Sequence, residues 1–262
     1  MRIHLHPAAW IGFLLNCLVV YLFLTALTGI DINVFTEEEQ HLIGMVMEKG
    51  EAIRSTLYVV LAMQAVAMGL LATRSMLGLP VAVLGALLML PGSLLYLIGC
   101  LLTHYRNKFS DFIPAPKAYG EALFRFSSAF APIMRIAASV SIALSFLAAY
   151  TGWLNAAALC FGVSLAALFF AFRSRATPPL TIFRDCCTVT PGLFASTVLI
   201  PYAKIRLATL RPDQCILFEV ETEQGLRPLP WSLRSVIQSE RREALEKLGS
   251  VLSEHGVPLD QS

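Results

Sequence analysis

A run of thirty-seven residues, 136–172, contains no Asp, Glu, Lys or Arg. A helix needs roughly 20 apolar residues to cross a hydrocarbon core about 30 Å thick, so this run is long enough for nearly two crossings. Near its middle, residues 151–155 (Thr-Gly-Trp-Leu-Asn) have the composition of a tight turn. The run therefore predicts two antiparallel membrane helices, and the bilayer is the solvent for this part of the chain.

Three further long apolar stretches lie upstream, and the composition agrees with a membrane protein. Of the 262 residues, 56% are hydrophobic and only 15% are charged, and the mean hydropathy is +0.66. These values exclude an ordinary soluble domain. We expect a membrane α-helical bundle of about five transmembrane helices over residues 1–177. The predicted spans are about 8–28, 53–72, 79–102, 132–150 and 154–172.

A polar interval separates the third and fourth predicted spans. Within it, Tyr119, Leu123, Phe126 and Phe130 recur at spacings of four, three and four residues. This is the period of a helix with one apolar face. We expect an amphipathic interfacial helix over about 117–130, lying in the plane of the lipid headgroups.

The positions of Lys and Arg near the predicted span ends give the expected orientation. Residues 103–177 hold seven Lys and Arg against two Asp and Glu, whereas residues 178–262 are balanced at nine against ten. A cytosolic C-terminal region places nine flanking cations inside and leaves only Arg2 and Arg74 outside. With five spans, this orientation predicts an external N-terminus.

After Pro178 and Pro179 the sequence changes to short β-rich runs separated by turn residues. The clearest unit is a hairpin of residues 203–210 and 215–222 around the turn 211–214, Arg-Pro-Asp-Gln. We expect one apolar face and one face of opposite charges across the strands. The expected register pairs Leu210 with Cys215, Leu207 with Phe218, Ile205 with Val220, Arg206 with Glu219 and Lys204 with Glu221. A C-terminal helix follows, with Gly256 just past its end.

This order of short strands and one C-terminal helix resembles the bacterial pleckstrin-homology-like family over about residues 178–256. The resemblance rests on residues 180–185 (Leu-Thr-Ile-Phe-Arg-Asp), 190–193 (Thr-Pro-Gly-Leu), 200–205 (Ile-Pro-Tyr-Ala-Lys-Ile) and 229–231 (Leu-Pro-Trp). It implies a small β-rich, pleckstrin-homology-like domain with a C-terminal α-helix over 178–262. It also implies a multi-pass protein of the bacterial inner membrane, with this domain in the cytoplasm. It does not explain the upstream helices.

Four basic residues of this domain, Arg184, Lys204, Arg206 and Arg211, form the candidate face for a partner or a headgroup. Domains of the family that it resembles can use such residues to bind lipid headgroups. The expected pairing of Lys204 and Arg206 with glutamates neutralises half of this face, which disfavours a strong anionic-lipid site and favours a solvated sheet surface.

No motif in the sequence indicates catalysis or metal binding. The five histidines are scattered, and the six cysteines lack the spacing of a zinc site. The spans carry no charged residue away from their ends, so they lack the groups of an ion pathway. We expect no enzymatic activity, no cofactor, no metal and no nucleic-acid partner.

Two functions remain open. The first is a non-enzymatic inner-membrane protein that presents its cytosolic domain as a docking or regulatory module to a protein partner, bound along an exposed strand edge. The second is a transporter or channel accessory subunit, or a protein that protects against a membrane-active toxin, acting through its helical bundle. The many Ala, Gly and Ser residues of the last two spans favour close packing, as in an obligate bundle or a homo-oligomer.

Overall fold

The computed structural model describes residues 5–28, 44, 48–87, 89, 93–116 and 120–261. Contacts divide the chain into two units, residues 1–104 and 105–262. Four of the described helices are long and apolar enough to cross a membrane, over residues 7–26, 50–72, 130–150 and 156–176. Long apolar helices are therefore confirmed at four of the five predicted places. The change in composition after residue 177 does not coincide with this division, because the contacts group the last two spans with the β-strands.

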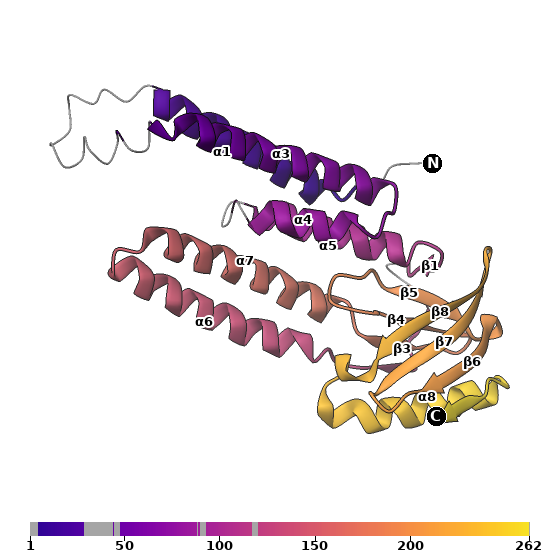
Figure 1. The fold of residues 1–262 in the computed structure, drawn as a ribbon. Coiled ribbons are helices and arrows are strands. Elements are labelled where there is room, and N and C mark those ends of the chain that lie inside the picture. The colour runs from indigo at the N-terminus through magenta and orange to yellow at the C-terminus, as the bar shows by residue number, and fades with distance from the viewer. Residues whose placement is uncertain are drawn as a thin grey trace. The chain divides into compact units, whose positions relative to one another are not determined.

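The first unit contains α1 (Pro7–Thr28), α3 (Gly50–Ala72), α4 (Gly78–Leu87) and most of α5 (Leu94–Lys108) (Figure 1). The single helix expected over 79–102 is not formed. The intervening sequence contains Pro91 and Gly92, both unfavourable inside a helix, so α4 and α5 are separate helices. At ten residues, α4 is only about half the length that a crossing needs.

The helices α4 and α5 run antiparallel to each other, beside α3 and α1. Along α4, Gly78 lies against Leu71 and Gly85 lies against Gln64, so α4 is antiparallel to α3. Along α5, the Ser93 hydroxyl accepts from Asn16 at 3.2 Å and the Thr103 hydroxyl accepts from the His6 amide at 2.9 Å, so α5 is antiparallel to α1. α4 therefore begins beside the C-terminus of α3 and ends near the middle of α3, whereas α5 begins near the middle of α1 and reaches the N-terminus of α1.

A buried polar cluster fixes the inner end of this hairpin. Asn16, Gln64 and Ser93 are at most 1% exposed. The Asn16 amide donates to Gln64 Oε1 at 2.9 Å, and Gln64 Nε2 donates to the Gly85 carbonyl at 3.0 Å. The Tyr96 hydroxyl donates to the Gln64 carbonyl at 2.9 Å. Gln64 thus joins all four helices of the unit, and an unpaired amide at this depth would be costly.

Two glycines allow α1 and α5 to pack backbone against backbone. A Cβ atom added at Gly12 would lie 2.2 Å from the Tyr96 nitrogen, and one added at Gly99 would lie 2.0 Å from the Ala9 nitrogen. Any larger residue at either position would force the two helices apart. Small residues serve the same purpose in many membrane helix pairs.

The second unit begins its membrane part with α6 (Phe130–Tyr150) and α7 (Leu154–Ala176). They form an antiparallel pair, and Gly152 adopts the positive φ of 80° in the turn between them. The Ser145 hydroxyl donates to the Ala157 carbonyl at 2.8 Å, and the Ser164 hydroxyl donates to the Ala138 carbonyl at 3.1 Å. The predicted hairpin of two membrane helices is confirmed here.

Two β-sheets and a C-terminal helix complete the second unit. The five-stranded sheet has the order β1-β5-β4-β3-β2, and the four-stranded sheet has the order β8-β7-β6-β9. The strands are β1 (Ile113–Pro114), β2 (Phe124–Arg125), β3 (Leu180–Ile182), β4 (Cys186–Val189), β5 (Val198–Pro201), β6 (Ile205–Leu210), β7 (Cys215–Thr222), β8 (Gly225–Ser232) and β9 (Leu259–Gln261). Three short 3₁₀ turns are η2 (Tyr202–Lys204), η3 (Leu233–Ser235) and η4 (Gln238–Glu240).

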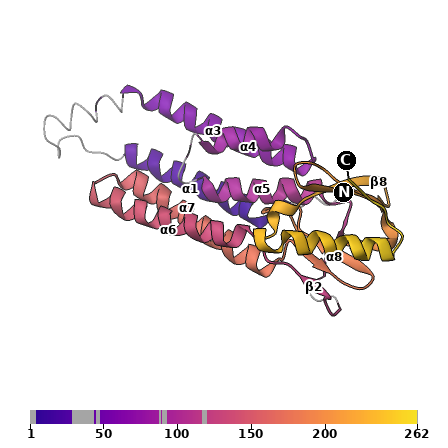
Figure 2. The same ribbon diagram turned by 90° about the horizontal axis from the view of Figure 1, so that it is seen from below.

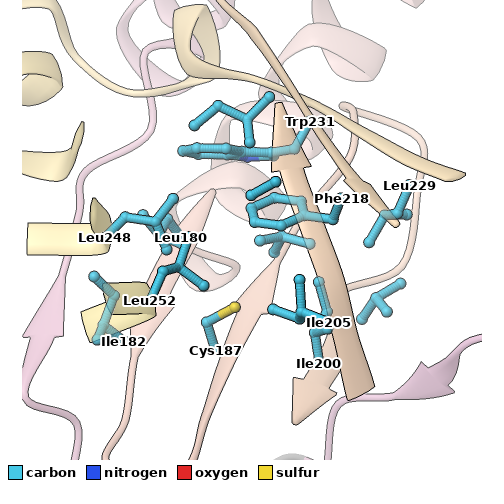
Figure 3. Close-up of a cluster of buried hydrophobic side chains, with 14 of the residues drawn as sticks. Leu180, Ile182, Cys187, Ile200, Ile205, Phe218, Leu229, Trp231, Leu248 and Leu252 are labelled. Carbon is cyan, nitrogen blue, oxygen red and sulfur yellow. The ribbon is translucent and has the colours of Figure 1, made fainter. Parts of the chain in front are cut away.

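The helix α8 (Arg241–Glu254) contributes to a core shared with both sheets. Figure 3 shows Leu248 and Leu252 of α8 near Leu180 and Ile182, with Trp231 and Phe218 in the same cluster. Gly256, with φ of 70°, lies just past the helix as the sequence predicted. A β-rich region closed by a C-terminal helix is thus confirmed.

The interfacial helix expected over 117–130 is wrong for the described residues 120–129, and 117–119 lie outside the description. Phe124 and Arg125 form β2, which pairs with Ile182 and Thr181. Phe126 is buried while Arg125 and Ser127 are exposed. This alternation has the period of a strand, and pairing with β3 satisfies the backbone that a surface helix would have satisfied internally.

The register of the β6–β7 hairpin is partly as expected. Ile205 faces Val220 as predicted, but Ala208, rather than Leu207, faces Phe218. The turn is one residue longer than expected, with Gln214 at a positive φ of 62°. Leu210 therefore pairs with Ile216 rather than with Cys215. A β-bulge between Ile205 and Leu207 then cancels the offset.

The close approach of α1 and α5 predicts the effect of side chains at their contact. Gly99→Val should lower the free energy of unfolding by about 3 kcal/mol or more, because its Cβ overlaps the Ala9 backbone. Gly69→Ala is the matched control, because a Cβ there meets nothing within 4 Å. Denaturant titration of the purified protein in mild detergent measures both, and an equal effect of the two changes would contradict the packing.

Candidate functional site

The membrane hairpin α6–α7 is inserted into the five-stranded sheet. The strands β1 and β2 precede α6 in the chain, whereas their partners β5 and β3 follow α7. The sheet is therefore assembled from both sides of the hairpin. This connection leaves little freedom between the β-rich region and α6–α7.

A second set of contacts joins the start of α6 to the segment before α8. The Ala129 amide donates to the Ser235 carbonyl at 2.8 Å, and the Ile237 amide donates to the Ser127 carbonyl at 3.1 Å. The Glu240 carboxylate accepts from the Ser127 amide at 2.6 Å and from its hydroxyl at 3.0 Å. Figure 2 shows the first turn of α8 beside the N-terminal end of α6. The N-terminus of α8 is thus fixed next to the point where α6 begins.

The four basic residues predicted from the sequence are exposed but do not form one face. Arg184, in the β3–β4 turn, and Lys204, in η2, are near each other, because the neighbouring Tyr202 amide donates to the Asp185 carbonyl at 3.1 Å. Arg206 lies close by in sequence and pairs with Glu221 at 2.7 Å, not with Glu219. Arg211 lies at the other end of β6, so the structure separates it from the other three.

Arg211 instead lines a groove with Arg241 and Arg242. The groove has a volume of about 450 Å³ and lies between the β6–β7 turn and the start of α8. Its remaining lining residues are Leu210, Pro212, Gln214, Leu233 and Leu245. Three arginines therefore line one groove together with three leucines and a proline.

The three arginines differ in how far their charges are already paired. Arg242 Nε donates to Glu246 at 2.8 Å on the exposed face of α8. Arg241 donates only to carbonyls, from Nε to Val236 at 3.0 Å and from Nη2 to Arg234 at 3.2 Å. Within the described part of the chain, the Arg211 side chain makes no hydrogen bond or ion pair, whereas its backbone amide donates to the Cys215 carbonyl at 2.9 Å. The groove therefore has a net positive charge, and a neutral carbonyl pair leaves the Arg241 charge available to an anion.

Sequence reasoning did not identify Arg241 and Arg242. One signal was present, because two adjacent arginines begin a helix at the end where the dipole disfavours positive charge. The assembly of the groove was not visible, because thirty residues separate Arg211 from Arg241 along the chain. Among the described residues there is no group of three His, Cys, Asp or Glu side chains that could bind a metal ion.

Cys215 follows the β6–β7 turn that lines the groove, and the pKa of its thiol depends on the charge of Arg211. Its pKa is raised by burial and by Asp213, and the Arg211 charge opposes this rise. Arg211→Gln should therefore raise the thiol pKa further and slow alkylation at pH 8, whereas Asp213→Asn should lower the pKa and accelerate alkylation. Mass spectrometry of Cys215 after timed exposure to iodoacetamide measures both rates. Buried Cys187, whose pKa is also raised, is the internal control that should stay unlabelled. Equal rates in both variants would contradict the arrangement.

Comparison with known proteins gives no family for this chain. No protein-family model, no curated protein and no solved structure matches it.

Proposed function

We propose that this chain is a non-enzymatic membrane protein that presents a rigidly mounted β-rich domain as a docking or regulatory module to a protein partner. The observation that carries this proposal is the insertion of α6–α7 into the five-stranded sheet. A domain tethered by two connections has a fixed distance and orientation relative to its membrane helices. Such mounting suits a surface that must meet another membrane-bound protein in one geometry.

The connection after α7 is also short and bonded. Only three residues, 177–179, separate α7 from β3. The Thr190 hydroxyl donates to the Pro178 carbonyl at 3.0 Å, and the Thr190 amide donates to the Pro179 carbonyl at 2.9 Å. This region therefore lacks the properties of a flexible linker, and we do not propose a domain that searches a large volume.

The resemblance to pleckstrin-homology-like domains supports a binding module. The five-stranded sheet is antiparallel, the four-stranded sheet is antiparallel except for β9, which pairs parallel with β6, and α8 packs against both sheets, which is in keeping with that architecture. Partner binding along the edge of β8 is disfavoured, because Pro228 and Pro230 have no backbone N–H to donate. We therefore propose recognition by side chains rather than by strand addition.

We propose that the α4–α5 pair is a re-entrant hairpin that does not cross the membrane, and this changes the expected topology. Four crossing helices place the N-terminus and the β-rich domain on the same side of the membrane. Arg2 and Arg74 then join that side, while Lys49 and Arg54 move to the other, so the ratio of flanking cations stays at nine to two. The positive-inside rule therefore supports a cytoplasmic β-rich domain and, in place of the external N-terminus expected from five spans, a cytoplasmic N-terminus. A bacterial inner membrane remains part of this proposal.

One observation favours the second candidate function, action through the helical bundle as a transport accessory or toxin-protective protein. The buried Asn16–Gln64–Ser93 cluster lies at the inner end of a re-entrant hairpin. Non-helical backbone at membrane depth occurs where protein covers it or where it lines a water-filled cavity. The polar cluster could therefore serve either packing or a path for a neutral solute.

Photo-crosslinking in intact cells separates the two functions. A photoreactive phenylalanine analogue at Leu226, 53% exposed near the β7–β8 turn, should capture one discrete protein if the domain is a docking module. The same analogue at Phe146 of α6, 74% exposed, tests the bundle. Adducts from Phe146 but not from Leu226 would reject the docking proposal.

The full chain is required for this experiment. Deletion of residues 178–262 would remove the partners of β1 and β2 and expose Phe126, which is 4% exposed in the intact chain. A truncated chain would therefore combine loss of the domain with misfolding of what remains. A competing copy of the wild-type chain should reduce the Leu226 adduct in proportion to its expression, which identifies specific capture.

A further inference from the structure

We propose that the groove lined by Arg211, Arg241 and Arg242 binds an acidic segment of the protein partner, in which Asp or Glu side chains flank a large apolar side chain. This inference rests on the proposed docking function, because it names the surface that meets the partner and the chemistry of the segment that occupies it. The composition of the groove, the pairing of its charges and its volume support the assignment.

The side chains that line the groove have the composition of a protein–protein contact. Its charged members are all arginine, and the others are three leucines, a proline and a glutamine. Arginine is enriched at protein interfaces and often contributes much of the binding energy, whereas lysine, aspartate and glutamate are depleted there. Among the described residues, no Lys, Asp or Glu lines the groove. It therefore combines apolar side chains with charges of one sign, which matches a ligand that is acidic and partly apolar.

The arginines of the groove are complementary to carboxylates. The Arg211 side chain makes no hydrogen bond or ion pair within the described residues. Arg241 donates to two backbone carbonyls, so its side chain is held in place while its charge is not neutralised. Arg242 already binds a carboxylate, because its Nε donates to Glu246 at 2.8 Å. A guanidinium can form two parallel hydrogen bonds with a carboxylate, so Arg211 and Arg241 are the groups available to acidic side chains of a partner.

Two further acidic side chains near the groove have partners elsewhere. Asp213 accepts from the Cys215 amide at 3.1 Å. Glu240 accepts from the Ser127 amide at 2.6 Å and from the Ser127 hydroxyl at 3.0 Å. Both carboxylates are therefore engaged outside the groove.

The number of cations and the volume of the groove favour a peptide segment over a membrane surface. Attraction to anionic membranes is typical of clusters of four to eight Lys and Arg, and three arginines line this groove. Its volume of about 450 Å³ falls within the range of small-ligand sites, roughly 300–1,000 Å³, which suits a few side chains. Leu210, Leu233 and Leu245 supply an apolar contact for one of them.

Binding of a defined peptide by the full chain tests the proposal. The protein is placed in nanodiscs of phosphatidylcholine, which has no net charge, and the fluorescent peptide Glu-Glu-Leu-Glu-Glu is titrated by anisotropy. Its counterpart Gln-Gln-Leu-Gln-Gln should bind about tenfold more weakly, because it lacks the carboxylates. Arg211→Gln should weaken binding of the acidic peptide about fivefold, as expected for the loss of one ion pair, and Arg211→Lys should retain most of the affinity.

Arg206→Gln is the matched control, because Arg206 is an exposed arginine of β6 that lies outside the groove and pairs with Glu221. Its affinity for the acidic peptide should equal that of the wild type. Arg211→Glu should bind Lys-Lys-Leu-Lys-Lys more tightly than the wild type does, which tests direct contact. Equal binding of the Glu and Gln peptides by the wild type, or an equal loss in the two glutamine variants, would overturn the proposal.

Alkylation of Cys215 separates the peptide from a lipid or a free anion. A carboxylate next to Arg211 cancels the charge that favours the thiolate, so the acidic peptide should slow alkylation more than the glutamine peptide does. Phosphatidylglycerol nanodiscs and inorganic phosphate are tested separately without peptide. Slowing by either of these, with no effect of the acidic peptide, would assign the groove to a headgroup or a free anion and reject the peptide.

Photo-crosslinking in intact cells separates a failure of this inference from a failure of the docking function. The adduct from Leu226 should be lost in Arg211→Glu and retained in Arg206→Gln. An adduct that survives Arg211→Glu would reject the groove as the docking surface and leave the docking function intact. Absence of an adduct from the wild-type background would reject the docking function, and this inference with it.

Discussion

Backbone pairing across the α6–α7 hairpin is the interaction on which the second unit depends. Four residues before α6 form strands with residues that follow α7, so the sheet closes only when the hairpin has returned to its starting side. The hydrogen bonds from Ala129 to Ser235 and from Ile237 to Ser127 extend this pairing to the segment before α8. Because the core of both sheets and α8 is continuous, anchoring one sheet positions the whole β-rich region.

In the first unit, buried polar groups lie near the end of α4 and the start of α5. A helix that stops within a membrane leaves backbone groups that lipid cannot satisfy. Here Gln64 donates to the Gly85 carbonyl near the end of α4, and the Ser93 hydroxyl accepts from Asn16 at the start of α5. Gly12 and Gly99 bring α1 and α5 close enough to cover this region. The polar cluster and the glycine contact therefore hold the same antiparallel pair, α4 and α5, against α1 and α3.

The groove depends on how the β-rich region is connected to the start of α6. Two adjacent arginines at the start of a helix do not by themselves indicate a binding site. Glu240 accepts hydrogen bonds from Ser127 next to the start of α6, which fixes the position of the neighbouring Arg241 and Arg242 relative to α6. The β6–β7 turn then adds Arg211 to the same concave surface.

The sequence by itself determined the membrane helices, the turn at Gly152, the β-rich C-terminal region and the residue past α8, because each depends on local hydropathy or local backbone preference. It did not determine the division of the third apolar stretch into α4 and α5, because strong hydropathy outweighs the signal of Pro91 and Gly92. It also did not determine the strand at Phe124, where a helical spacing competes with pairing to β3. Only the tertiary structure shows that Arg211 lies apart from the other three predicted basic residues and lines a groove with Arg241 and Arg242. That grouping depends on strand register, a bulge at Arg206 and a contact between Ser127 and Glu240, none of which is encoded by residues close together in the chain.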